Sequence, residues 1–436
     1  MTPYLDELVV ETGHDFRIHT TIYTDPAIFE LEMRRIFERT WVYVAHESEL
    51  PNPGDYVTTT LGSQPVIVTR DQQGEVHVLL NHCRHRGSVV CRAERGHAEQ
   101  FVCPYHNWVY GVDGCLLGIA QATGYPEDML GPDSGLVPAR RVATYRGLIF
   151  ASMSAQGESL RERLTVVAKY IDLWADRSPT GKITFTRGAH KHLYAGNWKF
   201  QLENGSDGYH GNYVHESFLK IMEQAGETSI RDYKNLRSTG SVVGLGRGDG
   251  FIERPYGGMA GQFEYHDPKL TDYHQQLRQA YGPDRAQDIL GQRNLLVFPN
   301  LYLFESHVRV IRPLALDQTI VLMQPTRLDG VSDALNTARL RTHERFFGPA
   351  AFGAPDDVEM FAIGQSGMKA RAAEWVVMSR GMLRESYAES YADGESETDG
   401  IRVGGHSTDE APQRSAYREW KRWMAASPVP ADAVLA

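Results

Sequence analysis

Four potential metal-binding side chains in two short segments constrain the fold of this chain more than any other feature. Cys83 and His85 form a C-x-H segment, and Cys103 and His106 form a C-x2-H segment seventeen residues further on. Each segment offers one thiolate and one imidazole. The fold must therefore bring two loops together around a shared centre, and the β-rich sequence around residues 56–80 predicts that a small β domain carries them.

The alternation of cysteine and histidine indicates which centre this is. A [2Fe-2S] cluster of the Rieske type has two different irons, one bound by both cysteines and the other by both histidines. A structural zinc site also uses two loops, but it usually pairs Cys with Cys and His with His on separate elements. The sequence therefore favours the cluster over zinc. Cys91 and Cys115 lie outside the two segments, and we predict that they are buried thiols without a ligand role.

A second group of metal-binding residue types lies in residues 203–215. His210 and His215, together with one carboxylate, suit non-haem Fe(II) with open coordination positions. Asn204, Asp207 and His210 recur every three residues and would share one face of a helix, whereas His210 and His215 would point about 140° apart. We therefore expect a widened turn or a helix end between the histidines. The alternative is a surface helix with two unrelated histidines.

The third ligand must come from elsewhere in the chain. Asp356 and Asp357 open what we predict to be a helix, and one of them is the candidate. Acidic residues are also favoured at a helix N-terminus by the helix dipole alone, so the pattern leaves both assignments open.

Composition limits the partners of the chain. With 436 residues it should fold into two domains, or three. Its formal net charge of -10 disfavours nucleic acid and anionic membranes, which points to a small molecule or another protein. The sequence contains neither a signal-peptide pattern nor an apolar run long enough to span a membrane, so we expect a cytoplasmic location. Its four cysteines are too clustered for a disulfide framework.

The remaining pattern predicts an α+β chain. Residues 1–40 should form an N-terminal helical segment that packs on the catalytic domain, residues 41–155 the cluster-binding β domain, and residues 156–436 the catalytic domain. The expected elements are a helix that opens at Thr24–Pro26, a hairpin turn at Asp71–Gly74, a strand at Tyr145–Phe150, a helix at Leu160–Trp174, a strand at Ile183–Thr186, a loop at Gly244–Gly250, a β meander over residues 295–324, a helix at Ser332–Phe347 and a final helix at Thr408–Met424. Residues 221–290 show little pattern.

These motifs resemble those of one family. The segments C-x-H-R-G and C-x2-H-x-W, followed by N-W-K…E-N-x-x-D-x-Y-H-x4-H, are similar to the large subunits of Rieske non-haem iron ring-hydroxylating dioxygenases. Three further stretches resemble the branch that acts on benzoate, toluate and anthranilate: Tyr23–Asp71, Phe298–Asn300 and Trp375–Gly381. The likeness runs from about Tyr23 to Met424. It implies a Rieske domain followed by a helix-grip domain with a curved antiparallel sheet, and it selects Asp357 as the third iron ligand.

The resemblance also implies a reaction and an assembly. Large subunits of this family form trimers, alone or with three small (beta) subunits, and they use O2 to convert an aromatic ring to a cis-dihydrodiol. Electrons come from NADH through a flavin/[2Fe-2S] reductase, directly or through a ferredoxin. This sequence has no Rossmann fingerprint after a strand, so we do not expect it to bind NADH itself. In the family, the residue at Asp207 links His210 to His106 of the neighbouring subunit. Asn204 and Tyr209 are further candidates for residues near the iron.

The sequence defines the substrate less well than it defines the metal centres. An aromatic carboxylate needs a cationic or multiple-donor partner when it is buried, and Arg309 is our candidate. Strand alternation puts Arg309 and Ile311 on one face and Val308 and Val310 on the other. The alternative is an arginine on a solvated face or in a structural ion pair.

Two other functions remain open from sequence. One is a Rieske monooxygenase that hydroxylates a ring once or demethylates an ether, because the same ligands serve both outcomes. The other is an electron carrier in which the second metal site is vestigial.

Overall fold

The fold is described from a computed structural model. It describes residues 5–126, 131–186, 188–226, 240–254, 271–387 and 401–426. The chain divides into two compact units. The cluster unit comprises Met33–Arg163, and the sheet unit combines Met1–Glu32 with Leu164–Ser427.

The cluster unit is built from small antiparallel sheets, as the sequence predicts for a β domain. One sheet has the order β6-β5-β4-β7, a second the order β10-β9-β8, and a third the order β11-β12-β3. Their strands are β3 (Val42–His46), β4 (Asp55–Leu61), β5 (Gln64–Arg70), β6 (Val76–Leu80), β7 (Arg95–His97), β8 (Gln100–Val102), β9 (Val109–Gly111), β10 (Leu116–Gly118), β11 (Arg141–Tyr145) and β12 (Leu148–Ser152). The predicted turn at Asp71–Gly74 joins β5 to β6, where the Asp71 carboxylate accepts hydrogen bonds from two backbone N–H groups at 2.9 Å.

The prediction of one strand at Tyr145–Phe150 is wrong. The chain turns sharply at Arg146 and Gly147, which have φ values of 51° and 82°, so the apolar run belongs to a hairpin of β11 and β12. A Cβ atom on Gly147 would lie 2.5 Å from the His46 ring, which is why only glycine fits there. Because Arg146 gives no turn signal, the pattern looks like one continuous strand.

The N-terminal segment is not wholly helical, contrary to prediction. Strands β1 (Val9–Thr12) and β2 (Asp15–His19) form a hairpin, and β2 pairs with β21 (Trp375–Val377). The helices follow as α1 (Thr21–Thr24) and α2 (Pro26–Glu32), and α2 continues into a π-helical turn at Met33–Phe37. The predicted helix opening is confirmed, because the backbone N–H of Ala27 donates to Asp25 at 2.7 Å. The short β-hairpin was missed because its two strands are only four and five residues long.

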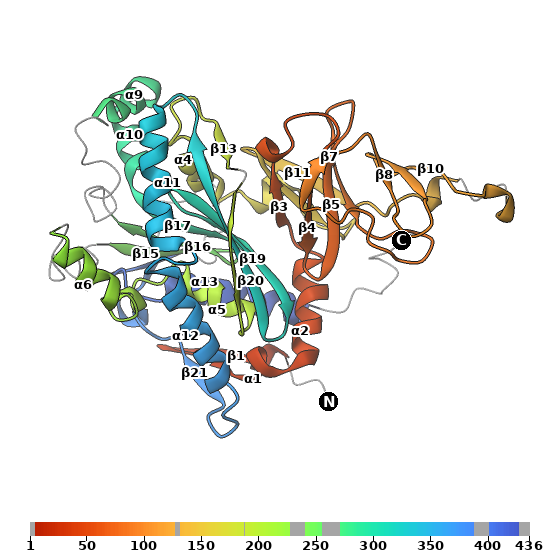
Figure 1. Cartoon of the computed structure of the whole chain (residues 1–436). Coiled ribbons are helices and arrows are strands. Elements are labelled where there is room, and N and C mark those ends of the chain that lie inside the picture. Colours follow the sequence, from red (N-terminus) through yellow and green to blue (C-terminus); the bar gives the residue numbers. More distant parts are fainter. Residues whose placement is uncertain are drawn as a thin grey trace. The chain divides into compact units, whose positions relative to one another are not determined.

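In the described part of the sheet unit, ten antiparallel strands form one large sheet (Figure 1). The strand order is β13-β20-β19-β18-β17-β16-β15-β23-β22, and β14 also pairs with β20. The strands are β13 (Ile183–Phe185), β14 (His190–Tyr194), β15 (Ser241–Gly246), β16 (Asp249–Arg254), β17 (Gln292–Val297), β18 (Leu301–Leu303), β19 (His307–Ala315), β20 (Gln318–Leu328), β22 (Ser386–Tyr387) and β23 (Ile401–Gly404). The predicted meander over residues 295–324 is confirmed as β17 to β20.

The glycine-rich stretch Gly244–Gly250 is a hairpin rather than a loop. It forms the end of β15, a turn at Arg247–Gly248 and the start of β16. Cβ atoms on Gly244 and Gly250 would lie 2.7 Å and 2.9 Å from atoms of Ala411 and Pro412. These glycines therefore allow the start of the last helix to approach the strands closely.

The sheet unit also contains helices, several of which pack on the large sheet. They are α4 (Ala168–Ala175), α5 (Trp198–Asn204), α6 (Glu216–Gln224), α9 (Thr271–Tyr281), α10 (Pro283–Leu290), α11 (Asp333–Phe347), α12 (Ala354–Gly367) and α13 (Ala411–Ala425). Helix α11 packs against β20, α12 against β14 and α5, and α13 against β15 and β16 (Figure 1). The predicted N-cap of α11 is present, because Ser332 Oγ accepts from the backbone N–H of Leu335 at 3.2 Å. On α13 the predicted apolar face is fully buried.

Two helical predictions need correction. The helix predicted at Leu160–Trp174 is broken into α3 (Leu160–Arg163) and α4. Helices α9 and α10 were not predicted, because few of their side chains are buried and their apolar residues show only weak periodicity. Residues 227–239 and 255–270 of the stretch with little pattern lie outside the described residues. No helix that the structure describes is long and apolar enough to cross a membrane.

Candidate metal centres

The two cysteine loops have the same backbone geometry. In each loop the fourth residue after the cysteine, Gly87 or Asn107, donates its backbone N–H to the cysteine carbonyl, at 2.9 Å for Cys83 and 3.1 Å for Cys103. Both of these residues adopt a left-handed conformation, with φ values of 73° and 60°. Glycine and asparagine tolerate this conformation best. Two matched tight turns therefore present the four candidate ligands.

The histidines of the two loops lie next to each other. The ring centroids of His85 and His106 are 4.5 Å apart. Trp108 stacks on His85 at 5.2 Å with nearly parallel rings, and Tyr105 lies 3.7 Å from the His106 ring. Aromatic neighbours thus fix the orientation of both imidazoles.

The four cysteines differ in their surroundings. Burial would raise the pKa of the Cys103 thiol, but hydrogen bonds from backbone N–H groups and from Cys83 lower it overall. Burial raises the pKa of Cys91 to about 12. Because a metal-binding thiol must be deprotonated, these shifts favour Cys103 as a ligand and Cys91 as an inert thiol. Cys115 is exposed, which corrects the prediction of a buried thiol there.

The spacing of the ligand atoms argues against zinc in the cysteine loops. One tetrahedral Zn2+ would hold its four ligand atoms within about 4 Å of one another. Among the described residues, the only group of three such side chains whose ligand atoms lie within 4.8 Å of one another is His210, His215 and Asp357. The two loops therefore do not converge on one ion. This fits a cluster in which the cysteines and the histidines bind different irons.

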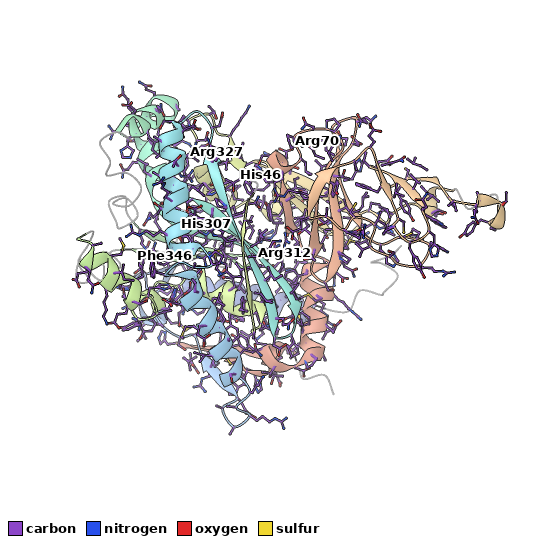
Figure 2. The ribbon with its side chains drawn as sticks, in the orientation of Figure 1. His46, Arg70, His307, Arg312, Arg327 and Phe346 are labelled. Carbon is purple, nitrogen blue, oxygen red and sulfur yellow. The ribbon has the colours of Figure 1, made fainter. Side chains whose placement is uncertain are left out.

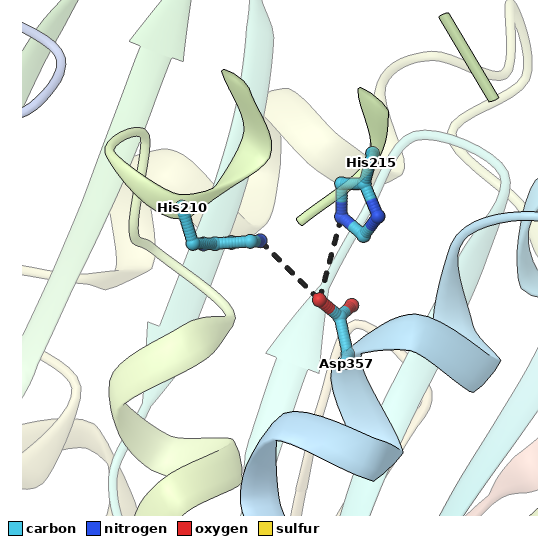
Figure 3. Close-up of side chains that lie close together, drawn as sticks. All are labelled: His210, His215 and Asp357. Carbon is cyan, nitrogen blue, oxygen red and sulfur yellow. Dashed lines mark ion pairs between the residues drawn. The ribbon is translucent and has the colours of Figure 1, made fainter. Parts of the chain in front are cut away.

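The second site gathers two imidazoles and one carboxylate (Figure 3). Asp357 Oδ1 lies 3.4 Å from Nε2 of His210 and 3.3 Å from Nε2 of His215. The two rings approach this oxygen from different directions, and their centroids are 5.3 Å apart. His215 and Asp357 are buried. Three ligand atoms that meet at one point leave further coordination positions of a metal ion open, as non-haem Fe(II) sites that use O2 require.

The predicted helix end between the two histidines is present. Helix α5 ends at Asn204, a single 3-10 turn spans His210–Asn212, and His215 directly precedes α6. The expected helical stripe of Asn204, Asp207 and His210 is wrong, since α5 ends at Asn204 and Asp207 lies beyond the turn that follows it. The three side chains still meet. Asp207 Oδ2 lies 2.9 Å from Nδ1 of His210, and Asn204 Nδ2 lies 3.3 Å from Nε2 of His210.

Asp207 sets the tautomer of His210. Burial would raise the pKa of Asp207, but the hydrogen bond and charge of His210 and the backbone N–H of Tyr209 lower it overall. The ionised carboxylate can only accept, so Nδ1 of His210 carries the proton and Nε2 keeps its lone pair toward Asp357. Tyr209 is half-exposed, and its ring lies under the guanidinium of Arg380 at 4.0 Å rather than at the metal-binding atoms.

The structure distinguishes the two acids of α12. Asp357 points its carboxylate at the histidines and also accepts from Asn204 Nδ2 at 3.2 Å. Asp356 Oδ2 lies 3.7 Å from Nδ1 of His215, on the side of the ring away from Asp357. Burial and the charge of Asp357 raise the pKa of Asp356. Asp356 therefore faces Nδ1 of His215 from beyond hydrogen-bond distance, and Asp357 is the acid placed to bind the metal.

Arg309 is buried on β19, with 3% of its surface exposed. Its Nε donates to Nε2 of His307 at 3.3 Å, and its guanidinium lies 4.2 Å above the Phe304 ring and 4.9 Å above the Phe347 ring. Burial lowers the pKa of Arg309 to about 10, against the opposing influence of the Asp357 charge. No acid among the described residues forms an ion pair with it. Both alternatives, a solvated face and a structural ion pair, therefore fail for the described residues.

The sequence did not identify an aromatic and imidazole shell around this arginine. Phe346 of α11 lies 5.1 Å from His215 and 4.7 Å from Phe347, so it connects the metal-binding atoms to the surroundings of Arg309. His307 of β19 and Phe346 are marked in Figure 2. His343 of α11 lies 4.6 Å from His307, ring to ring, and neither of its ring nitrogens has a hydrogen-bond partner among the described residues. The polar alternation of His307 and Arg309 in an apolar strand was the available signal.

Comparison with known proteins supports the same two-part organisation. Residues 40–129 match the family described as Rieske [2Fe-2S] domain, and residues 176–426 match the family described as ring hydroxylating alpha subunit (catalytic domain). The chain is 33% identical to the anthranilate 1,2-dioxygenase large subunit of Acinetobacter baylyi, over 93% of this chain and 89% of that protein. It is 36% identical to toluate 1,2-dioxygenase subunit alpha of Pseudomonas putida, over 84% and 82%.

A solved structure of naphthalene 1,2-dioxygenase with indole bound in the active site has the same fold, with a TM-score of 0.84 at 25% identity. The match covers 98% of this chain and 95% of that one. The protein is thus an oxidoreductase that combines a Rieske domain with a mononuclear iron domain. The chain belongs to the family of aromatic ring-hydroxylating dioxygenase large subunits. Members of this family are components of oligomeric oxygenases that work with a beta subunit and a reductase.

Proposed function

We propose that the residues of the two centres bind the two iron cofactors of a terminal oxygenase. The convergence of two imidazoles and one carboxylate on a common point carries this proposal. The assigned ligands are Cys83, His85, Cys103 and His106 for the [2Fe-2S] cluster, and His210, His215 and Asp357 for Fe(II). A chain with a vestigial second site would have no reason to keep these three ligand atoms together, so the electron-carrier alternative is disfavoured.

The reaction proposed is cis-dihydroxylation of an aromatic ring. When bound, the iron supplies O2 activation and the cluster supplies electrons. The protein orients the imidazole of His210 through Asp207, which accepts a hydrogen bond from Nδ1 and leaves the Nε2 lone pair for the metal. Phe346 and Phe347 provide an apolar shell next to His215 that suits an aromatic substrate and excludes water.

The electron path is proposed to cross between subunits of a trimer, with or without beta subunits. Asp207 has 27% of its side chain exposed, and His106 is also partly exposed, so each can be reached by another molecule. Asp207 would accept a hydrogen bond from His106 of the neighbouring subunit while it holds His210. Electrons would enter from an NADH-dependent flavin/[2Fe-2S] reductase, directly or through a ferredoxin.

The substrate proposed is an aromatic carboxylate. Arg309 has a buried positive charge, and its terminal nitrogens have no acceptor among the described residues. Such a charge is costly to bury unless a ligand supplies the missing anion. The relatives named after anthranilate, 2-halobenzoate and toluate support this class of substrate.

The role of Arg309 can be tested with Arg309→Met. If Arg309 pairs with the carboxylate, the variant should raise KM for the acid by at least about 30-fold, because a buried charged partner is lost. The corresponding amide should be affected little. Arg312→Met is the matched control, since strand alternation puts Arg312 on the opposite face of β19 from Arg309. Equal effects of Arg309→Met on acid and amide would show that Arg309 is structural.

Labelled oxygen tests the reaction itself. Incubation of a panel of aromatic acids with 18O2, NADH and a matched reductase should give a product that carries both atoms from one O2 molecule. A product with one labelled atom, or one that has lost an alkyl group, would assign the chain to the monooxygenase alternative.

A further inference from the structure

Three oxygen atoms, one each from Tyr23, Glu203 and Tyr417, form a triangle next to the residue that contacts the mononuclear site. Tyr23 Oη lies 2.6 Å from Oε1 of Glu203 and 2.6 Å from Oη of Tyr417. Tyr417 Oη also contacts Oε1 of Glu203. Both tyrosines are fully buried, whereas Glu203 is partly buried on α5. The three oxygens are therefore mutually within hydrogen-bond distance.

The number of hydrogens in this triangle decides the charge of Glu203. Three contacts can all be hydrogen bonds only if three hydrogens are present. The hydroxyl groups of Tyr23 and Tyr417 supply one each, so an ionised Glu203 leaves one contact between two oxygens without a hydrogen. A protonated Glu203 closes the ring, because its O–H can donate to one tyrosine while the same oxygen accepts from the other.

The electrostatic surroundings agree with the geometry. Burial raises the pKa of Glu203 to about 7 from its ordinary value of 4.5, although Tyr23, Tyr417 and Lys199 oppose this rise. The charge of Lys199 is offset by Glu32, which it contacts at 2.6 Å. The charged and titratable groups that face Glu203 come from the helices and from the sheet. From the helices they are Tyr23 of α1, Lys199 of α5, Glu410 before α13 and Tyr417 of α13, with Glu32 of α2 acting through Tyr23 and Lys199. From the sheet they are Tyr194 of β14 and Tyr302 of β18.

The triangle is connected to the metal-binding atoms through one residue. Asn204 follows Glu203 and is the last residue of α5. Its Nδ2 lies 3.3 Å from Nε2 of His210 and 3.2 Å from Oδ1 of Asp357. Any shift of Glu203 relative to Tyr23 and Tyr417 would therefore move a group that touches two of the three assigned ligands.

We propose that Glu203 is a positioning residue whose neutral carboxyl closes a hydrogen-bonded ring with Tyr23 and Tyr417 and so holds Asn204 against the iron site. This inference rests on the proposed function of His210 and Asp357 as iron ligands. Ionisation of Glu203 opens the ring and places a negative charge among buried groups. The mononuclear site then holds its iron less firmly.

The sign of the pH effect follows from the raised pKa. Below pH 4.5 the carboxyl is neutral in both folded and unfolded chains, and the ring contributes its full stabilisation. The contribution decreases as pH rises from there and is lost above about pH 7, where the folded chain also releases the proton. Iron retention should therefore weaken on the alkaline side of neutrality. Histidine ligands alone predict the opposite, since their deprotonation favours metal binding.

Two measurements on the iron-loaded protein test this inference. The first is the infrared carbonyl band of a protonated carboxyl, taken as the difference between wild type and Glu203→Gln at pH 6 and at pH 8. The second is the rate at which a chelator removes the mononuclear iron over the same pH range. We expect the band at pH 6 and not at pH 8. The removal rate should rise about fivefold between the two pH values in the wild type, which is the effect of one lost hydrogen bond, and it should not rise in Glu203→Gln.

Two further variants separate this role from a purely structural one. Tyr417→Phe removes one of the three oxygens of the ring, so the ring cannot close and iron should be released at the faster rate at both pH values. Glu410→Gln removes a negative charge that raises the pKa of Glu203, so it should move the pH transition in iron removal to lower pH without abolishing it. A transition that persists in Glu203→Gln, or disappears in Glu410→Gln, would overturn the inference, as would the absence of the carboxyl band. If iron never binds at His210 and Asp357, the proposed function fails, whereas the infrared band still reports on the ring.

Discussion

Replacement of Asp357 by alanine should remove the mononuclear iron and reduce ring oxidation by more than about 100-fold. Loss of a residue that only orients a ligand costs up to about 100-fold, and loss of a ligand should cost more. Asp357 Oδ1 lies within 3.4 Å of both histidine nitrogens, so no neighbouring described carboxylate can replace it without a change of backbone. The visible absorption of the Rieske cluster should stay unchanged. Iron analysis, absorption spectra and product formation measure the three effects on one preparation.

Asp356→Ala is the matched control for this substitution, because it removes the adjacent acid of the same helix. It should keep most of the iron, since Asp356 lies behind His215. His85→Ala should instead remove the Rieske absorption. If Asp356→Ala lost the iron and Asp357→Ala kept it, the ligand would have been assigned to the wrong acid. Loss of the Rieske absorption in Asp357→Ala would contradict two independent centres.

Asp207→Asn should slow electron transfer from the reduced cluster to the mononuclear iron by about 100-fold or more and keep both metals in place. Asparagine can still accept a hydrogen bond from His210, so the ligand stays oriented. The asparagine lacks the negative charge that would stabilise hydrogen bonds from two imidazoles at once, so the proposed link to the neighbouring subunit is weakened. Rapid mixing of reduced protein with O2 and substrate measures this single-turnover rate directly.

Asp71→Asn is the control for a general loss of a carboxylate–histidine pair. Asp71 contacts His77 at 2.7 Å in the cluster unit, in a pair that involves none of the assigned ligands. Its substitution should leave the electron-transfer rate unchanged. An unchanged rate in Asp207→Asn would remove the bridging role, and loss of the mononuclear iron there would make Asp207 a ligand.

The sequence predicted the fold where chemistry or a long repeat left few alternatives. The two cysteine loops, the meander of β17 to β20 and the capped helix α11 were all recognisable, because metal ligands and apolar periods restrict local structure strongly. The break between His210 and His215 could also be predicted. Five residues of regular helix would point the two rings in different directions, and both must reach Asp357.

Other features depend on contacts that local pattern does not encode. The turn at Arg146 and Gly147 was missed because the apolar run continues across it, and the glycines of β15 and β16 serve the approach of α13 rather than a loop. Strand alternation could not predict that both faces of β19 are buried, so the sequence left open whether Arg309 is solvated. The ring of Glu203 with Tyr23 and Tyr417 joins residues from opposite ends of the chain.

The central claim is that one chain holds two separate iron centres, and metal analysis tests it most directly. Protein produced with ample iron and sulfide supply should contain about three iron atoms and about two acid-labile sulfides per chain. Chelation should then remove about one iron and all oxygenase activity without loss of sulfide or of the Rieske absorption. A protein with full sulfide that never holds more than about two irons would contradict the account, since His210, His215 and Asp357 would then bind no metal.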